Sequence, residues 1–468
     1  MKTFGTVIKK VKGLQFLFEK LPLSSSLGRN ALLHQPLSHN PAQLQAAFDT
    51  VEAMMVLLRN DADRKIIERI GIKLGQTNDI HGTVKALESR QILDDIQLFE
   101  VKKFALLADD IRELLLQTGF SAVEIPLLSK TINILDPQNQ RIPHFYIYPE
   151  YDETLRALRQ EYESLYTKLP EAAETIRLQC VEREDVVRQN LSKQLSAQHK
   201  ALFKTLEAVA QLDIIIAKAL LAKDFAFCKP IIGTTKTVFQ QLFNPYVKDL
   251  LTQKNKSFQA IDIEFGNEPT LITGVNMGGK TVFLRSIQLA QYLFQFGFYV
   301  PAAEAVIVPV EDILTSLNDE GQAEASGLSS FAAEMAVVSD IVKAAKAKKN
   351  ILALIDELAR TTNPQEGNAI VNAVLDILSE NHTRAFITTH YGNIRSYCRK
   401  LRVKGLIKEK MDGVQGVAGL NDCIDYALVE HREGDAPMAA LTIARILKMD
   451  DDIILKAEQF IQSNKSHQ

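Results

Sequence analysis

The sequence predicts a two-part protein, with an all-α amino-terminal part that contains long helices and an α/β part after it. Neither glycine nor proline occurs from Glu171 to Lys229, which favours helix over this stretch. After Pro230, short apolar runs alternate with helical patterns, as is typical of an α/β layer. At roughly 150 residues per domain, the length of 468 residues corresponds to about three domains.

Composition and charge narrow the class of protein. The chain is 46% hydrophobic and 24% charged, which is ordinary globular composition. Its 54 basic and 57 acidic residues give a net charge of −3, so any nucleic-acid-binding surface has to be local. The four cysteines are far apart and form no C-x-x-C pair, which indicates a reducing compartment. The apolar run Ile214–Leu221 is short and contains Lys218. We therefore expect a soluble, cytoplasmic protein without membrane contact.

The first part, residues 1–150, is expected to form a helical core domain. Phe104, Leu107, Ile111 and Leu114 recur on one face of a helix that runs out near Gly119. Residues 120–150 contain four prolines around β-rich runs, which predicts an irregular or short-strand insert.

Residues 151–235 are expected to form long lever helices. An apolar stripe from Leu155 to Leu169 ends before Pro170. If residues 171–229 formed one helix, it would be nearly 90 Å long at about 1.5 Å per residue, and we expect one break. A plain helical bundle is the alternative to a lever that connects distant parts, and we favour a lever embedded in a bundle.

Residues 236–445 are expected to form the α/β domain, followed by a helical tail at 446–468. Strands are expected at Ala260–Phe265, Thr270–Thr273, Ala305–Val308, Ile351–Ile355 and Ala385–Thr388.

Gly274–Thr281 matches the pattern G-x-x-x-x-G-K-[ST], between an apolar strand at 271–273 and a helical run at 282–294. Backbone N–H groups of such a loop surround phosphate oxygens, and the helix N-terminus adds positive potential. Lys280 would reach the β/γ-phosphates of ATP, and Thr281 would place its hydroxyl on Mg²⁺. The strand and helix on the correct sides disfavour a chance glycine-rich turn. The residues expected to bind the nucleotide here are Gly274, Asn276, Gly278, Gly279, Lys280 and Thr281.

Two further strands end in residues that suit phosphate chemistry. Asp356 and Glu357 follow the strand 351–355; Asp356 suits the Mg²⁺ position, and Glu357 suits positioning or deprotonating a water. Such an acidic pair also occurs on plain surfaces, but the upstream loop makes the catalytic interpretation strong. His390 follows the strand 385–388. A structural histidine is the alternative, but on neighbouring strands it would lie near Glu357 and sense the γ-phosphate.

Ser326–Phe331 precedes a helical run at 332–342. Its serines are either ordinary N-caps or ligands for a phosphate that another subunit presents.

These motifs together resemble the MutS family of ABC-type ATPases. The stretches that carry the resemblance are Leu271–Arg285, Val300–Ala302, Ser326–Met335, Asp356–Gly367 and Thr389–Tyr391, with weaker likeness at Leu27–Leu37 and Leu98–Phe104. The resemblance implies a helical core with levers and a carboxy-terminal P-loop ATPase domain that uses ATP and Mg²⁺. It further implies a homodimer or a heterodimer with a related subunit, in which Ser329 and Ser330 act across the interface. Phe258 matches the aromatic residue that packs on adenine in the family.

The sequence also departs from the family pattern. The match begins at the helical core, so we expect the mismatch-reading, connector and clamp domains to be absent. Leu328 replaces a family arginine, and Ala359, Thr361 and Pro364 alter the loop after the acidic pair. The missing domains argue against DNA encirclement and mismatch reading, whereas the loop changes bear on dimer coupling and leave ATP binding intact.

Two clients remain as alternatives. One is DNA, since the family includes mismatch repair and recombination proteins, and basic residues on 171–229 could contact phosphates. The acidic residues interleaved with them favour a solvated helix face instead. The other is a protein, as in MutS-like ATPases that reactivate cobalamin-dependent aminomutases.

Overall fold

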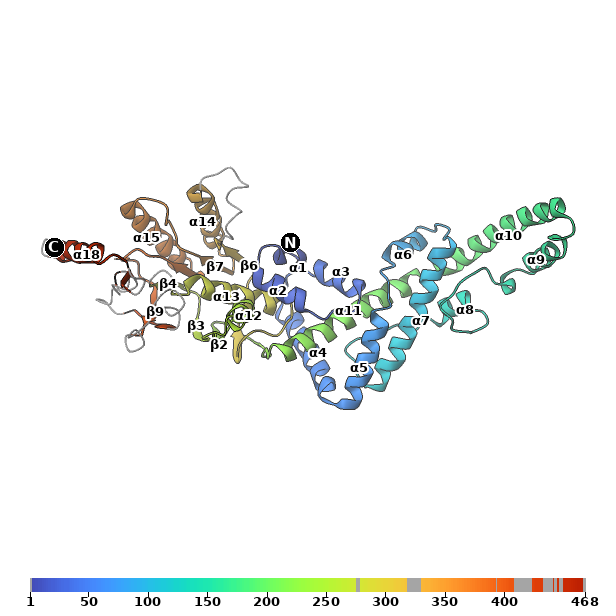
Figure 1. Ribbon diagram of the computed structural model, residues 1–468, viewed down its shortest axis with the longest axis horizontal. Helices are drawn as coiled ribbons and strands as arrows, with labels where there is room; N and C mark the ends of the chain where they lie inside the picture. Colours follow the sequence, from blue (N-terminus) through green and yellow to red (C-terminus); the bar gives the residue numbers. More distant parts are fainter. Residues whose placement is uncertain are drawn as a thin grey trace.

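The computed structural model describes residues 2–274, 278–317, 330–392, 394–407, 423–431, 441, 444–445 and 449–465. The molecule is elongated, with the strands toward one end and a helical arm at the other (Figure 1). Within the described residues, no helix combines the length and the apolar character that crossing a membrane requires.

Residues 2–225 are helical. The elements are α1 (Phe4–Ile8), α2 (Lys12–Lys20), α3 (Ser26–His34), α4 (Pro41–Arg59), α5 (Asp61–Leu74), α6 (His81–Glu88), α7 (Asp95–Gln117), α8 (Ser129–Leu135), the 3₁₀ turn η1 (Pro149–Tyr151), α9 (Glu153–Leu165), α10 (Pro170–Ser196) and α11 (His199–Asp224). The long glycine- and proline-free stretch is thus two helices with one break between Ser196 and His199, as expected.

The insert at 120–150 contains α8 but no strand. The short-strand alternative is therefore wrong and the irregular one is right. Prolines at four positions remove backbone donors that a strand ladder needs. Tertiary contacts hold the segment instead: the buried Lys102 ammonium on α7 donates to the Asp136 carboxylate at 3.1 Å and to the Tyr148 hydroxyl at 2.9 Å.

The described residues between 231 and 465 are of mixed α/β structure. The elements are β1 (Ile231–Ile232), β2 (Thr237–Leu242), α12 (Pro245–Thr252), β3 (Ile261–Phe265), β4 (Pro269–Thr273), α13 (Lys280–Gln295), β5 (Glu304–Ile307), β6 (Asp312–Thr315), α14 (Ser330–Lys346), β7 (Ile351–Ile355), α15 (Pro364–Glu380), β8 (Arg384–Thr388), β9 (Arg399–Leu406), β10 (Ile424–Glu430) and α18 (Asp451–Lys465). A four-stranded sheet has the order β1-β5-β2-β3, and a six-stranded sheet has the order β10-β9-β4-β8-β7-β6. In the larger sheet only β10 runs antiparallel to its neighbour.

Helices cover both faces of the six-stranded sheet. Alternate residues of a strand point to opposite sides, so neighbouring residues of one strand belong to different buried clusters. Leu271 and Ile387 pack in one buried cluster with residues of α14 and α15. Ile272 and Phe386 belong to the other cluster, which includes α13 and the amino-terminal helices. The core of the helical part is therefore continuous with the α13 face of this sheet.

The carboxy-terminal end of α13 is bonded directly to the helical part. The Gln295 side chain donates to the carbonyl oxygens of Ser38 at 3.0 Å and Val310 at 2.8 Å. The carbonyl oxygen of Phe296 accepts from Gln35 at 3.0 Å and from the Lys218 ammonium on α11 at 2.7 Å. Any displacement of α13 along its axis would thus act on α11.

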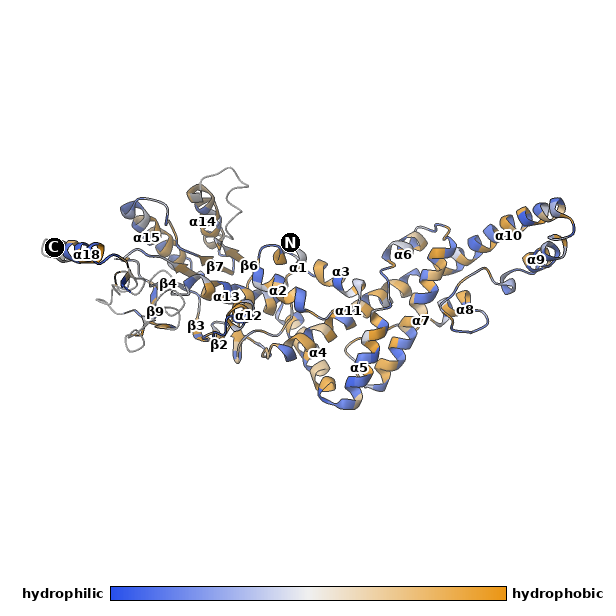
Figure 2. Cartoon of the chain, in the orientation of Figure 1, coloured by the Kyte–Doolittle hydropathy of each residue, from blue (hydrophilic) through white to orange (hydrophobic). Residues whose placement is uncertain are grey.

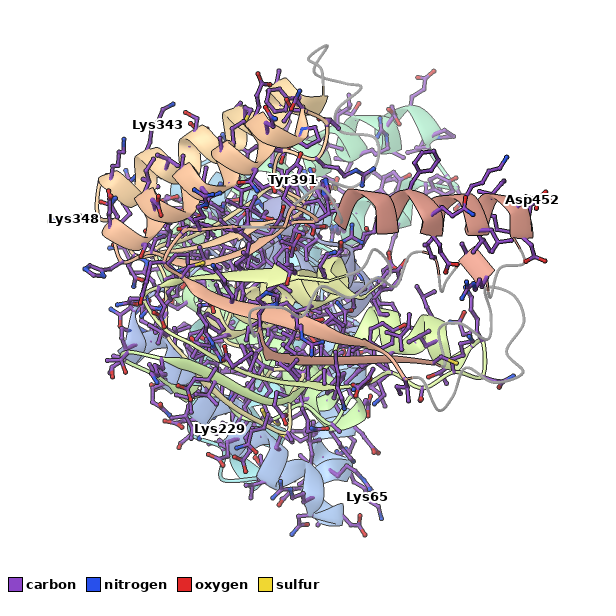
Figure 3. The ribbon with its side chains drawn as sticks, turned by 90° about the vertical axis from the view of Figure 1, so that its left-hand side faces the viewer. Lys65, Lys229, Lys343, Lys348, Tyr391 and Asp452 are labelled. Carbon is purple, nitrogen blue, oxygen red and sulfur yellow. The ribbon has the colours of Figure 1, made fainter. Side chains whose placement is uncertain are left out.

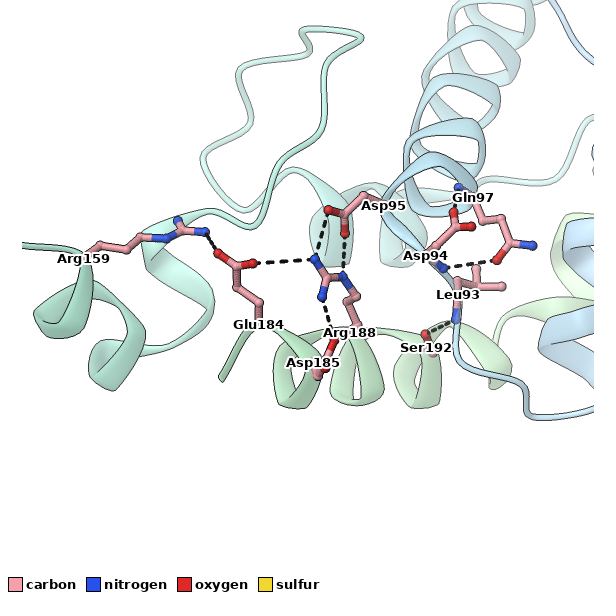
Figure 4. A network of polar contacts seen from close by, with 9 residues as sticks. All are labelled: Leu93, Asp94, Asp95, Gln97, Arg159, Glu184, Asp185, Arg188 and Ser192. Atoms are coloured by element: carbon pink, nitrogen blue, oxygen red, sulfur yellow. Dashed lines mark hydrogen bonds and ion pairs between the residues drawn. The ribbon is translucent and has the colours of Figure 1, made fainter. Parts of the chain in front are cut away.

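The arm consists of α9 and α10, which pack side by side and project from the body (Figure 1). Arg188 on α10 bonds Asp95 at the start of α7 at 2.8 Å, and Arg159 on α9 bonds Glu184 at 2.8 Å (Figure 4). Arg183 and Asp152 form a further pair at 2.6 Å. Hydrophilic residues predominate at the outer end of the arm (Figure 2).

We expect the buried lysine on α11 to make stability depend on pH. Burial lowers the pKa of Lys218 to about 7, so between pH 7 and 10 the unfolded chain holds a proton that the folded chain lacks. Stability therefore rises with pH in this window, by up to about 1.4 kcal/mol per pH unit. Urea unfolding of Lys218→Met, which cannot titrate, should lack this increment.

The exposed Lys223 on the same helix provides the control, since Lys223→Met should follow the wild-type chain at every pH. A constant stability difference between wild type and Lys218→Met from pH 7 to 9 would contradict the assignment.

Candidate nucleotide-binding site

The carboxyl ends of β4, β7 and β8 meet at one edge of the six-stranded sheet. Ile272 is opposite Thr388, and Ile355 is opposite Ile387, in parallel pairs. The loop after β4, the acidic pair after β7 and His390 after β8 therefore emerge at the same edge. The expectation that the strands before Glu357 and His390 are neighbours is confirmed.

The loop between β4 and α13 uses glycine where the backbone requires it. Gly274 has φ +141° and Gly279 has φ +75°, and both values favour glycine. Gly278 is buried, whereas Asn276 lies outside the described residues. The Lys280 ammonium, 5% exposed, donates to the Gly274 carbonyl oxygen at 2.6 Å. Burial lowers the pKa of Lys280, and nearby Glu357 and Asp356 oppose that shift.

Asp356 connects three elements at this edge. Its carboxylate accepts from the Thr281 hydroxyl on α13 at 2.6 Å and from the Thr388 hydroxyl on β8 at 2.6 Å. Its backbone N–H donates to the Ser316 hydroxyl at 3.1 Å. The Thr388 hydroxyl also accepts the Glu357 N–H at 2.7 Å. One carboxylate thus fixes the start of α13 relative to β7 and β8.

Thr281 and Asp356 fit a magnesium ion by the chemistry of their donors. Both offer oxygen ligands, and Mg²⁺ in phosphate-transfer sites keeps several waters and takes only one or two carboxylates from the protein. In the described part of the chain, no group of three or more His, Cys, Asp or Glu side chains could hold a metal by itself. The pair therefore suits a cation that a bound phosphate completes.

Glu357 and His390 lie near this pair but in different surroundings. The Glu357 carboxylate, with 20% side-chain exposure, forms an ion pair with the Arg360 guanidinium at 2.7 Å. His390 is exposed, and its ring centroid lies 4.2 Å from that of Tyr391. Glu357 itself has φ +47°, in the left-handed region that non-glycine residues seldom occupy.

Tyr426 lies against the glycine-rich loop, and the predicted adenine-packing residue Phe258 is next to a residue that bonds β10. Phe258 is half-buried just before β3, and the adjacent Gln259 bonds the Asp425 carboxylate and the Tyr426 N–H at 2.8 and 2.9 Å. The Tyr426 ring lies against Gly279, where a Cβ would come within 2.9 Å of it. β10 therefore closes over the glycine-rich loop.

One of the two predicted serines, Ser330, is the first residue of α14. Ser329 lies outside the described residues, and Ser330 begins α14 with a side chain that also lies outside them.

Sequence reasoning missed three residues at this site. Thr388 was read only as the end of a strand, because its contacts with Asp356 and Glu357 join segments that are distant in the sequence. Tyr426 and Arg360 had no signal in the sequence, because β10 and the loop after Glu357 reach the site through tertiary packing.

Thr388→Val should test whether Asp356 depends on its hydroxyl donors. The change preserves shape but leaves the Asp356 carboxylate and the Glu357 N–H without this partner, at a cost of about 1–3 kcal/mol. We expect a lower thermal unfolding midpoint and weaker magnesium-dependent nucleotide binding.

Thr270→Val on β4 is the matched control. The Thr270 hydroxyl is buried and, within the described residues, makes no hydrogen bond, so its removal should be neutral or stabilising. Equal effects of the two changes would contradict the special role of Thr388.

Comparison with known proteins identifies the α/β part. Residues 270–463 match the family described as MutS domain V. The chain is 30% identical to the Endonuclease MutS2 of Thermus thermophilus over 298 residues, which cover 63% of this chain and 37% of that protein. It is 34% identical to the Endonuclease MutS2 of Caldanaerobacter subterraneus over 220 residues, 46% of this chain and 26% of that protein.

The aligned regions thus span between a quarter and somewhat over a third of the length of these curated relatives. The alignment with the Thermus protein is longer than the domain V match itself. The domain match and the relatives together show that residues 270–463 form a MutS-family domain.

Proposed function

We propose that the chain binds and hydrolyses ATP at the edge of the six-stranded sheet and uses this cycle to move its long helices. The observation that carries the proposal is the Asp356 carboxylate held between the Thr281 and Thr388 hydroxyls beside the glycine-rich loop. A magnesium ion would neutralise charge on the β/γ-phosphates there.

Each site residue then has a defined task. Lys280 would contact the β/γ-phosphates, and Phe258 would pack on adenine. Glu357 would orient the attacking water, and His390 would sense the γ-phosphate. The Glu357 carboxylate is paired with the Arg360 guanidinium, so Arg360 would have to release it before Glu357 can bind a water.

Movement is proposed to travel from the loop through α13 into the arm. Lys280 and Thr281 begin α13, and the end of the same helix is bonded to Ser38, Gln35 and Lys218. Lys218 belongs to α11, which follows the arm helix α10 after the break at 197–198. A helix buried along most of its length moves as a unit, because packed cores are not continuously deformable.

A second subunit, identical or related, is proposed to complete the site. Ser329 and Ser330 would then meet the partner's phosphates. The proposed domains are a core at 1–150, levers at 151–235, the ATPase domain at 236–445 and a tail at 446–468.

We propose that the tip of the arm contacts a protein client rather than DNA. Three of the basic residues considered for phosphate contacts, Arg177, Arg183 and Arg188, form ion pairs with carboxylates. Residues 160–175 at the tip contain four glutamates and one lysine. Exposed Tyr166, Leu169, Leu178 and Val181 lie on the same hairpin. Acidic charge repels phosphate, whereas exposed apolar side chains are typical of protein contacts.

The name Endonuclease MutS2 belongs to relatives that are much longer than this chain, and it keeps DNA as the competing client. A reactivating factor for a cobalamin-dependent aminomutase is one form that the protein-directed alternative can take.

Glu357→Gln should lower ATP hydrolysis by roughly two orders of magnitude, the scale of losing a general base. ATP affinity should survive, because water positioning matters in the transition state and little in the ground state. Single-turnover hydrolysis and equilibrium binding measure the two effects separately.

Asp356→Asn provides the contrast, since losing a metal ligand should weaken magnesium-dependent ATP binding together with turnover. Lys280→Ala serves as the binding-deficient control. Near-normal hydrolysis in Glu357→Gln would move the base to another residue.

The client is tested by titrating DNA onto the chain at low salt. We expect no salt-dependent binding through the arm. A variant with Glu161, Glu163, Glu171 and Glu174 changed to Lys should acquire DNA affinity that falls steeply with salt. The opposite outcome would favour DNA as the client. In that case the wild-type chain binds DNA with a steep salt dependence, and substitutions to uncharged residues in the arm abolish this binding.

A further inference from the structure

The loop after β7 contains two strained residues. Glu357 has φ +47° and Ala359 has φ +61°, and neither is glycine. The left-handed conformation costs an L-residue roughly 1–2 kcal/mol. Such a residue persists where surrounding contacts over-determine its backbone.

Two side chains from other elements form hydrogen bonds with the Ala359 backbone. The Glu334 carboxylate on α14 accepts the Ala359 N–H at 2.9 Å. The Tyr391 hydroxyl, from the segment after β8, donates to the Ala359 carbonyl oxygen at 2.7 Å. Both polar groups of this residue are therefore occupied by partners far from it in the sequence.

The side chains around these two hydrogen bonds are closely packed. Tyr391 lies beside α14 and α15, while Lys343 and Lys348 lie on the outer side of the same layer (Figure 3). A Cβ added at Gly367 on α15 would come within 2.3 Å of the Tyr391 hydroxyl oxygen, so only glycine leaves room for that ring. Burial raises the pKa of Glu334, and its bond with Ala359 opposes the shift.

Ala359 lies two residues after the proposed base, Glu357. The Glu357 N–H donates to the Thr388 hydroxyl, and the Leu358 N–H donates to the Thr388 carbonyl oxygen at 3.1 Å. Residues 357–359 are therefore held at both ends, by β8 on one side and by Glu334 and Tyr391 on the other. The direction of the Glu357 side chain depends on both.

We propose that Glu334 and Tyr391 are positioning residues that aim Glu357 by holding the strained Ala359. This inference rests on the proposed function. It also gives α14 a role: the helix begins at Ser330, next to the segment expected to meet the partner's phosphates, so Glu334 links that segment to the hydrolytic step.

The contact is tested first without nucleotide. Glu334→Met removes the acceptor and keeps similar bulk, whereas Glu334→Gln retains an acceptor oxygen. Hydrogen exchange of the 357–360 segment should accelerate roughly tenfold or more in Glu334→Met and remain near wild type in Glu334→Gln. Unchanged exchange in a folded Glu334→Met chain would overturn the proposal.

The consequence is tested by hydrolysis. Glu334→Met should lower single-turnover hydrolysis roughly tenfold to a hundredfold, the scale of misplacing a catalytic group, with ATP affinity unchanged. Tyr391→Phe, which keeps the ring, should act in the same direction.

Ala359→Gly separates positioning from mere loss of structure. Glycine adopts positive φ without strain, so adding Ala359→Gly to Glu334→Met should restore part of the rate. Absence of any rescue, or a fall in ATP affinity equal to the fall in rate, would overturn the positioning role. A wild-type chain without hydrolysis would instead refute the proposed function, and the exchange measurement would still decide whether Glu334 holds Ala359.

Discussion

The site depends on one half-buried carboxylate that accepts two hydroxyl donors from different elements. Asp356 bonds Thr281 at the start of α13 and Thr388 at the end of β8, both at 2.6 Å. Hydrogen bonds to a charged acceptor are short and strong, and a buried carboxylate without them is costly. The position of α13 relative to the sheet is therefore set at the point where phosphate chemistry is expected, and ligand binding that competes for these oxygens acts on α13 first.

The rest of the molecule is built so that α13 and the arm share rigid connections. The end of α13 bonds the amino-terminal segment and α11 through Gln295, Phe296 and Lys218. The root of the arm is fixed to α7 by Arg188, which contacts Asp95 and Asp185 at once (Figure 4). Single surface ion pairs contribute little, but a network with a fixed guanidinium geometry restricts orientation. In the proposed function, this restriction would carry helix motion to the tip of the arm.

Much of the architecture could be predicted from the sequence because it depends on local patterns. The glycine- and proline-free stretch predicted α10 and α11, and short apolar runs predicted β4, β7 and β8. The position of Glu357 and His390 at one sheet edge followed from the rule that parallel strands end at one edge. Thr388, Glu334 and Tyr426 could not be placed, because their roles arise from contacts between distant segments. The insert at 120–150 was ambiguous for the same reason, since a buried lysine and not a ladder holds it.

Ala359 shows how a departure from a family pattern acquires physical meaning. From the sequence it was only a residue that altered the loop after the acidic pair. In the structure it adopts φ +61°, where alanine is strained and glycine would not be. Local rules fail most often at functional sites, where other contacts compensate for the strain. Glu334 and Tyr391 supply those contacts here. An alanine in this conformation makes the loop dependent on both neighbours, so the direction of Glu357 is tied to α14 and to the segment after β8 at the same time.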